Sequence, residues 1–246
     1  FLLAPGIVPP EVGTENTSDG ATLRVRAKKA AGDWVDLGAL PADVGLFPQR
    51  RIDLSAFSGS TIELELRADP CPEPCTGTPN ATLDTVFIAS PLVATRREKA
   101  RRVVMVFIDT LRPDHMSLYG YNRDTTAPLD AAFADAAVFT NARSVAPWTL
   151  PSARSVLTGR QPEDWSEATP LPQVFHDRGE PTAFFAGNIY LSTQFGLDRG
   201  WDLHRVELWP SADEVTDEAL TWLDETEGHG GLLQVHYMDP HLPYLE

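Results

Sequence analysis

The feature that most constrains the fold is an unbroken apolar run, rich in β-branched residues, at residues 103–108. Such a run predicts a strand that is buried on both faces of a sheet. The run stops at a carboxylate, Asp109. Because ligands of open α/β sheets lie outside the carboxyl ends of the strands, we interpret Asp109 as a candidate site residue.

Two later segments repeat this pattern. Residues 182–186 read as a buried strand that ends at Gly187-Asn188, and residues 232–238 read as a strand that runs into Asp239-Pro240-His241. Helical patterns lie between these strands, so we expect an α/β fold with a mostly parallel sheet and helices on both faces. The three strands would deliver Asp109, Asn188 and His241 to one edge of that sheet.

A helix is predicted to follow Trp148. Pro151 suits a first helical turn, residues 152–157 continue the helix, and Gly159 ends it. The hydroxyl of Thr149 would then lie at a helix N-terminus, where backbone N–H groups and the helix dipole favour an anion. A simple helix cap is the alternative role for this hydroxyl.

The segment IDTLRPDHMSLYGYNRDTTAPLD, followed by TLPSARSVLTG, resembles the N-terminal part of the sulfatase family, within the alkaline phosphatase superfamily. The likeness extends over residues 103–244. It implies that Asp109 binds a divalent metal, and that Thr149 stands at the nucleophile position and also contacts the metal. DPHLPY resembles the family segment whose His contacts the ester oxygen near the leaving group, which makes His241 the expected general acid. Ca²⁺ is the expected cation, with Mg²⁺, Mn²⁺ or Zn²⁺ as alternatives.

This sequence departs from the family pattern at four positions. The family nucleophile is usually a Cys or Ser oxidised to formylglycine, whereas the β-carbon of Thr149 carries a methyl group, so no formylglycine is expected. The motif arginine is displaced: Ala153 stands at its position and Arg154 follows it. Asn188 replaces a Lys, and Thr110 replaces a second ligating Asp. We name Arg154 and Asn188 as candidate substrate contacts.

The resemblance implies a metal-dependent hydrolase of sulfuric or phosphoric esters, acting on an anionic ester that can be carbohydrate-linked. Two alternatives stay open: a Thr-dependent phosphotransferase or phosphodiesterase of the same superfamily, and a catalytically silent sulfatase-like protein that binds a surface. Because the family's remaining metal ligands come from a later segment, the chain is expected to be the front of a longer protein with a half-built metal site.

Residues 1–95 predict a separate, β-sandwich-like accessory domain. Residues 21–27 and 61–68 alternate apolar and charged side chains, as strands with one wet face do. Five basic residues then fall within 96–102, which we interpret as a linker to a catalytic part at 103–246.

A net charge of −15 argues against nucleic acid or an anionic membrane as a partner. No stretch is long and apolar enough to span a membrane. The two cysteines, Cys71 and Cys75, could form a small disulfide in an oxidising compartment, with free thiols as the alternative. The expected location is therefore secreted, periplasmic or at the cell surface.

Overall fold

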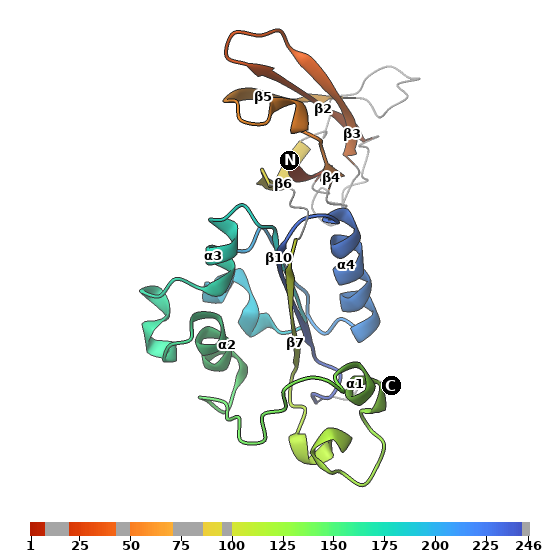
Figure 1. Cartoon of the computed structure of the whole chain (residues 1–246), viewed down its shortest axis with the longest axis vertical. Coiled ribbons are helices and arrows are strands. Elements are labelled where there is room, and N and C mark those ends of the chain that lie inside the picture. The colour runs from red at the N-terminus through yellow and green to blue at the C-terminus, as the bar shows by residue number, and fades with distance from the viewer. Residues whose placement is uncertain (8–19, 43–49, 71–85, 95–99, 243–246) are drawn as a thin grey trace, which may run out of the picture. The chain divides into compact units, whose positions relative to one another are not determined.

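The computed structural model describes most of the chain (Figure 1). The Cys71 and Cys75 pair, most of the basic linker and the end of the DPHLPY motif lie outside the described residues. The described ranges are 1–7, 20–42, 50–70, 86–94 and 100–242.

The chain divides into two compact units. One contains Phe1–Arg101 with two short later pieces, Gly179–Pro181 and Trp222–Gly230. The other contains the remaining residues from Arg102 onward. The division at 95 and 102 that the sequence suggests stays a prediction.

The first unit is built on two three-stranded antiparallel sheets. Their buried faces share a core that includes Leu3, Leu23, Val25 and Ile52. Antiparallel sheets thus precede the parallel sheet in the chain, and the β-sandwich-like accessory domain stays a prediction. One sheet has the strand order β4-β1-β6 and the other β3-β2-β5, with the bounds β1 Leu2–Ile7, β2 Ala21–Lys29, β3 Val35–Ala42, β4 Arg50–Arg51, β5 Ile62–Asp69 and β6 Val86–Leu92.

The charged positions of β2 explain its alternating sequence. Leu23 and Val25 are buried, whereas Arg26 on the other face pairs with Glu65 of β5 at 2.6 Å. Exposed pairs of this kind contribute about 0 to 1 kcal/mol each, so the buried face supplies most of the stability.

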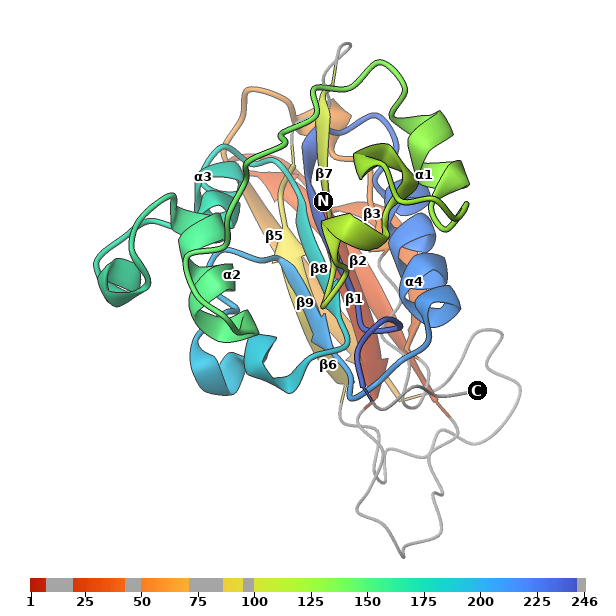
Figure 2. The ribbon, with the colours of Figure 1, turned by 90° about the horizontal axis from the view of Figure 1, so that it is seen from below.

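The second unit contains a parallel four-stranded sheet, and this confirms the α/β fold class. Figures 1 and 2 show helices α2 and α3 on one face of the sheet and α4 on the other. The strand order is β7-β10-β8-β9, with β7 Arg102–Ile108, β8 Thr182–Ala186, β9 Leu203–Val206 and β10 Gly231–Tyr237.

The ends of the helices follow local sequence signals. Helix α2 ends at Gly159, whose φ of 67° is in the left-handed region. Helix α4 begins with a capping box, in which the Ser211 N–H donates to Glu214 Oε2 at 2.8 Å. None of the described helices is long and apolar enough to cross a membrane. The helices are α1 Ala127–Ala132, α2 Thr149–Thr158, α3 Leu171–His176 and α4 Ala212–Glu225.

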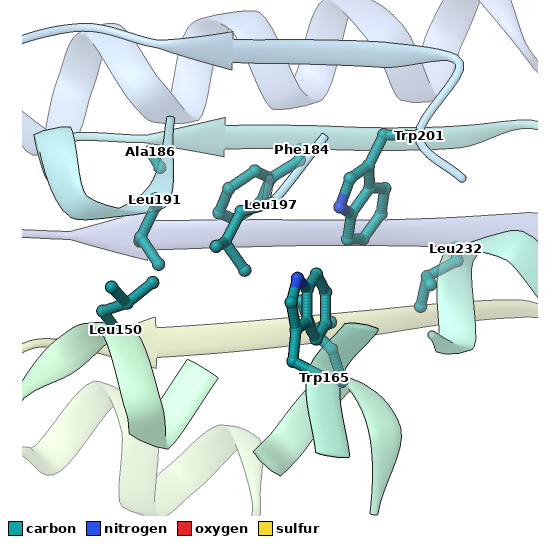
Figure 3. Packing of buried hydrophobic residues seen from close by; sticks show 9 residues of the cluster. Leu150, Trp165, Phe184, Ala186, Leu191, Leu197, Trp201 and Leu232 are labelled. Carbon is teal, nitrogen blue, oxygen red and sulfur yellow. The ribbon is translucent and has the colours of Figure 1, made fainter. Parts of the chain in front are cut away.

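A hydrophobic core lies between the sheet and α2 (Figure 3). Leu150 of α2 and Trp165 point toward side chains of the sheet and its loops, and Phe184 of β8 stacks on Trp201 with ring centroids 5.3 Å apart. Burial of each large side chain is worth about 1.5 to 3 kcal/mol. This core holds the start of α2 against the carboxyl ends of the strands.

Two local predictions are wrong. Val104 and Val106 of β7 are about half exposed, at 50% and 48%, because β7 is an edge strand of the described sheet. The apolar residues 137–141 (AVFTN) also predict a short strand, but the structure forms none there. Phe139 is 72% exposed, so its apolar character does not reflect burial among the described residues.

Candidate active site

The carboxyl ends of β7, β8 and β10 meet at one edge of the sheet. The backbone ladder continues just past the strands: the Asp109 N–H donates to Tyr237 O at 2.9 Å, and the Gly187 N–H donates to His236 O at 3.3 Å. A Cβ at Gly187 would lie 2.9 Å from Cγ of Met238, so the close approach requires glycine. The residues that follow these strands are therefore held side by side.

Thr149, the first residue of α2, contacts Asp109 across a separation of forty positions in sequence. Its Oγ1 donates to Asp109 Oδ2 at 3.0 Å. The predicted proximity of these two side chains is confirmed. The Thr149 hydroxyl does not act as a simple helix cap. It donates to a carboxylate on another element, and no side chain among the described residues caps the start of α2.

Asn188 joins the same pair. Its Nδ2 lies 3.3 Å from Asp109 Oδ2 and 3.2 Å from Thr149 Oγ1, while its Oδ1 accepts the Tyr190 N–H at 3.0 Å. The side chain is only 7% exposed, so these contacts fix its orientation. Its predicted role as a substrate contact stays a prediction.

His236 is the residue that the sequence reasoning missed. It lies on β10, is 4% exposed, and places Nε2 3.2 Å from Asp109 Oδ2. A polar side chain inside an otherwise apolar, buried strand usually has a partner, and this signal could have identified it.

The carboxylate of Asp109 is stabilised in its charged form. The hydrogen bond from His236 is the largest cause, partial burial opposes it, and hydrogen bonds from Thr149 and Asn188 add to it, so that the pKa of Asp109 is lowered to about 2. Asp109 is thus ionised at neutral pH and too weak a base to hold the proton of Thr149. An ionised, hard oxygen ligand is what a divalent cation requires.

Thr110, which follows Asp109, has a φ of 57°, a conformation that is rare for a β-branched residue. Its hydroxyl donates to Pro240 O at 2.9 Å. This contact ties the end of β7 to the Asp239-Pro240-His241 segment. The strained residue therefore stands at the site edge, where such backbone conformations often occur.

His241 lies next to that contact. Its Nδ1 is 2.5 Å from Leu242 O, and its ring centroid is 5.5 Å from that of Trp209. Among the described residues, no hydrogen bond joins His241 to Asp109 or Thr149. Its role as general acid stays a prediction.

Arg154 is directed elsewhere. Its Nη2 donates to Phe195 O at 3.1 Å, and its guanidinium carbon lies 5.9 Å from the ring centroid of Trp165. One residue of displacement rotates a side chain by about 100° around a helix, which accounts for this direction. Its contact with a substrate anion also stays a prediction.

A cavity of about 390 Å³ adjoins the site. Asp109, Thr149 and His236 line it, together with Trp148 and Gln234. This volume falls within the range of small-molecule pockets, which is about 300 to 1,000 Å³.

The oxygens of Asp109 and Thr149 fit one side of a cation site. They are 3.0 Å apart, which is about the spacing of adjacent oxygens that share one small divalent cation. Within the described part of the chain, no three His, Cys, Asp or Glu side chains gather to complete a metal cluster. The two residues therefore fit a cation as a partial set of ligands.

The structure is an α/β protein whose parallel sheet carries a carboxylate, an amide and a helix-borne threonine at its carboxyl edge. The chain belongs to the sulfatase family, because the sequence model of that family, described as Sulfatase, matches residues 101–246.

Among solved structures, the fold is similar to that of BT4656 in complex with its substrate D-glucosamine-2-N,6-O-disulfate. The TM-score is 0.53 at 19% sequence identity, and the match covers 60% of this chain and 36% of that chain. The chain thus spans little more than a third of the length of that neighbour. No match was found among curated proteins.

Proposed function

We propose that this protein is a metal-dependent hydrolase of sulfuric esters, with Thr149 as the nucleophile. The observation that carries the proposal is the 3.0 Å contact between Thr149 Oγ1 and Asp109 Oδ2 at the carboxyl edge of the sheet, inside the segment that the sulfatase family model matches. Family membership supports ester hydrolysis, and the contact supports the choice of nucleophile.

Each residue has a defined task in the proposed reaction. Thr149 Oγ1 gives its proton to solvent water and attacks the sulfur in line, forming an S–O bond as the S–O bond to the alcohol breaks. The departing alcohol oxygen takes a proton from His241. A water molecule then attacks the sulfur of the sulfated Thr149, which releases sulfate, restores the threonine hydroxyl and returns a proton to His241. Asn188 donates to Thr149 Oγ1 and thereby stabilises its alkoxide form.

Asp109 and Thr149 would hold the divalent cation, with Ca²⁺ as the first candidate. When bound, such a cation neutralises charge on the ester and lowers the pKa of a hydroxyl that it contacts. Because Asp109 is ionised at neutral pH, it needs no proton release before it binds the cation. Arg154 would need a rotamer change to reach the substrate.

Substitution and metal exchange test the proposal on the full-length protein. With 4-nitrophenyl sulfate as probe, Thr149→Ala and Asp109→Ala are expected to lower kcat/KM by about 100-fold or more. Thr158→Ala is the matched control, since Thr158 lies at the far end of α2, where its hydroxyl donates to Arg154 O at 2.7 Å and accepts the Arg160 N–H at 3.3 Å. Chelation should abolish turnover and Ca²⁺ should restore it. Parent-like rates in both site variants would refute the proposal.

The threonine itself favours a second candidate, a phosphotransferase or phosphodiesterase that forms a phospho-threonine. A threonine hydroxyl needs no oxidation before it attacks phosphorus. Mass spectrometry after rapid acid quench separates the candidates, since only this one predicts a phosphoryl adduct on Thr149.

The turnover assay with glucosamine 6-sulfate in place of 4-nitrophenyl sulfate tests the proposal that the ester is carbohydrate-linked. Secretion stays a prediction.

A further inference from the structure

His236 is a buried side chain that the proposed chemistry does not use. It lies on β10 between Phe107 of β7 and Ala186 of β8 in the sheet register. Its carbonyl accepts the Gly187 N–H, and the carbonyl of the next residue, Tyr237, accepts the Asp109 N–H. The backbone at His236 thus fixes both neighbouring strand ends, while its side chain contacts the carboxylate that follows one of them.

The direction of the side-chain hydrogen bond follows from chemistry. An ionised carboxylate only accepts hydrogen bonds, so Nε2 of His236 carries the proton and donates to Asp109 Oδ2 at 3.2 Å. The other ring nitrogen, Nδ1, is buried and has no hydrogen-bond partner among the described residues.

Three donors converge on one oxygen of Asp109. Thr149, Asn188 and His236 all contact Oδ2, and they come from α2, the end of β8 and β10. Donors from three separate elements fix the rotation of the carboxylate about its Cβ–Cγ bond. Of the three, His236 is the only one that lies on the central strand beside β7.

We propose that His236 is a positioning residue that holds the Asp109 carboxylate in the orientation in which it meets Thr149 and can bind a cation. The inference rests on the proposed function for its consequence in cation binding. Partners that orient a metal ligand in this way typically change metal affinity by 10- to 100-fold when they are removed.

Calcium affinity of the full-length protein, measured by calorimetry with CaCl₂ alone, is the first test. His236→Leu removes the donor and is expected to weaken Ca²⁺ binding about 10- to 100-fold. His236→Gln retains an N–H donor at a similar reach and is expected to stay within about 3-fold of the parent. The matched control for folding is Gln234→Leu, because Gln234 lies on the same strand and is 2% exposed.

The results separate positioning from other roles. Parent-like affinity in His236→Leu overturns the inference. An equal loss in His236→Gln and His236→Leu also overturns it, because the imidazole itself would then be required. The Tm values of His236→Leu and Gln234→Leu show whether unfolding explains a weaker Ca²⁺ affinity of His236→Leu. If His236→Leu does not fold, the Ca²⁺ affinity of His236→Gln tests the inference: an affinity within about 3-fold of the parent supports it, and a larger loss overturns it.

A metal-free measurement distinguishes this inference from the proposed function. Nitrogen-15 NMR of the His236 ring in the apo parent should show the proton on Nε2. A ring that carries its proton on Nδ1 alone overturns the inference, since Nε2 could not then donate to Asp109. If the parent binds no divalent cation but shows the proton on Nε2, the proposed metal dependence fails while the positioning of Asp109 against Thr149 is supported.

Discussion

Replacing Asn188 with alanine should destabilise the protein measurably. The side chain is 7% exposed and donates to both Asp109 and Thr149, and its Oδ1 accepts the Tyr190 N–H. Loss of the two donated hydrogen bonds costs about 1 kcal/mol each, and an unpaired peptide N–H adds about 1 kcal/mol or more. The expected total is a loss of about 2 to 4 kcal/mol.

Thermal unfolding, followed by circular dichroism at neutral pH, measures this loss. For a chain of this size, the expected decrease in Tm is roughly 4 to 16 °C. Ser192→Ala is the matched control, because the Ser192 hydroxyl is buried and has no partner among the described residues. The control should stay within about 0.5 kcal/mol of the parent.

A third variant, Asn188→Asp, separates hydrogen bonding from charge. It keeps an acceptor for the Tyr190 N–H but places a second carboxylate against Asp109, which raises the pKa of the new acid. A carboxyl group whose pKa is raised in the folded state lowers the free energy of unfolding at pH values above that pKa. The loss of unfolding free energy in Asn188→Asp, relative to the parent, should therefore become smaller as the pH falls below about 5. Two results would contradict this reasoning: a Tm of Asn188→Ala equal to that of the parent, or a decrease in Tm of Ser192→Ala as large as that of Asn188→Ala. Either would show that the hydrogen bonds of Asn188 do not stabilise this edge of the sheet.

Two further outcomes follow from the same structure. Because the pKa of Asp109 is lowered from 3.8 to about 2, its charge contributes stability that is present above 3.8 and lost as the pH falls through about 2. The difference in unfolding free energy between parent and Asp109→Asn should therefore decrease by about 1 to 2 kcal/mol from pH 5 to pH 2, after allowance for solvent screening. Urea denaturation at a series of pH values measures this difference. A difference that stays constant with pH contradicts the prediction. Gly200→Ala would place a Cβ 2.2 Å from Gln173 N, whereas Gly120→Ala, also at a positive φ, meets nothing within 4 Å. The first should lose at least about 2 kcal/mol more than the second, and equal Tm values would show that Gly200 is not packed against α3.

The carboxyl-edge rule explains why Asp109 and Asn188 could be placed together from sequence. Each follows a short apolar run that forms a parallel strand, and parallel strands end at the same side of the sheet. Pro151 and Gly159 mark the start and the end of α2, which places Thr149 at a helix N-terminus. The resemblance to the sulfatase family, and not the local pattern, linked Thr149 to Asp109.

The burial of β7 could not be predicted from the same patterns. An apolar run indicates a strand but not its position in the sheet, and β7 is an edge strand among the described ones. The direction of Arg154 toward Phe195 depends likewise on packing against a distant loop, which its own neighbours in sequence do not encode.

The sequence by itself indicated the strands that end at Asp109 and Asn188 and the two ends of α2, because apolar runs, prolines and glycines act within a few positions, and its resemblance to the sulfatase family brought Asp109 and Thr149 together. Only the tertiary structure decided that three donors share one oxygen of Asp109 and that His236 is one of them. Such convergence depends on strand register and side-chain rotamers set by contacts between residues far apart in the chain.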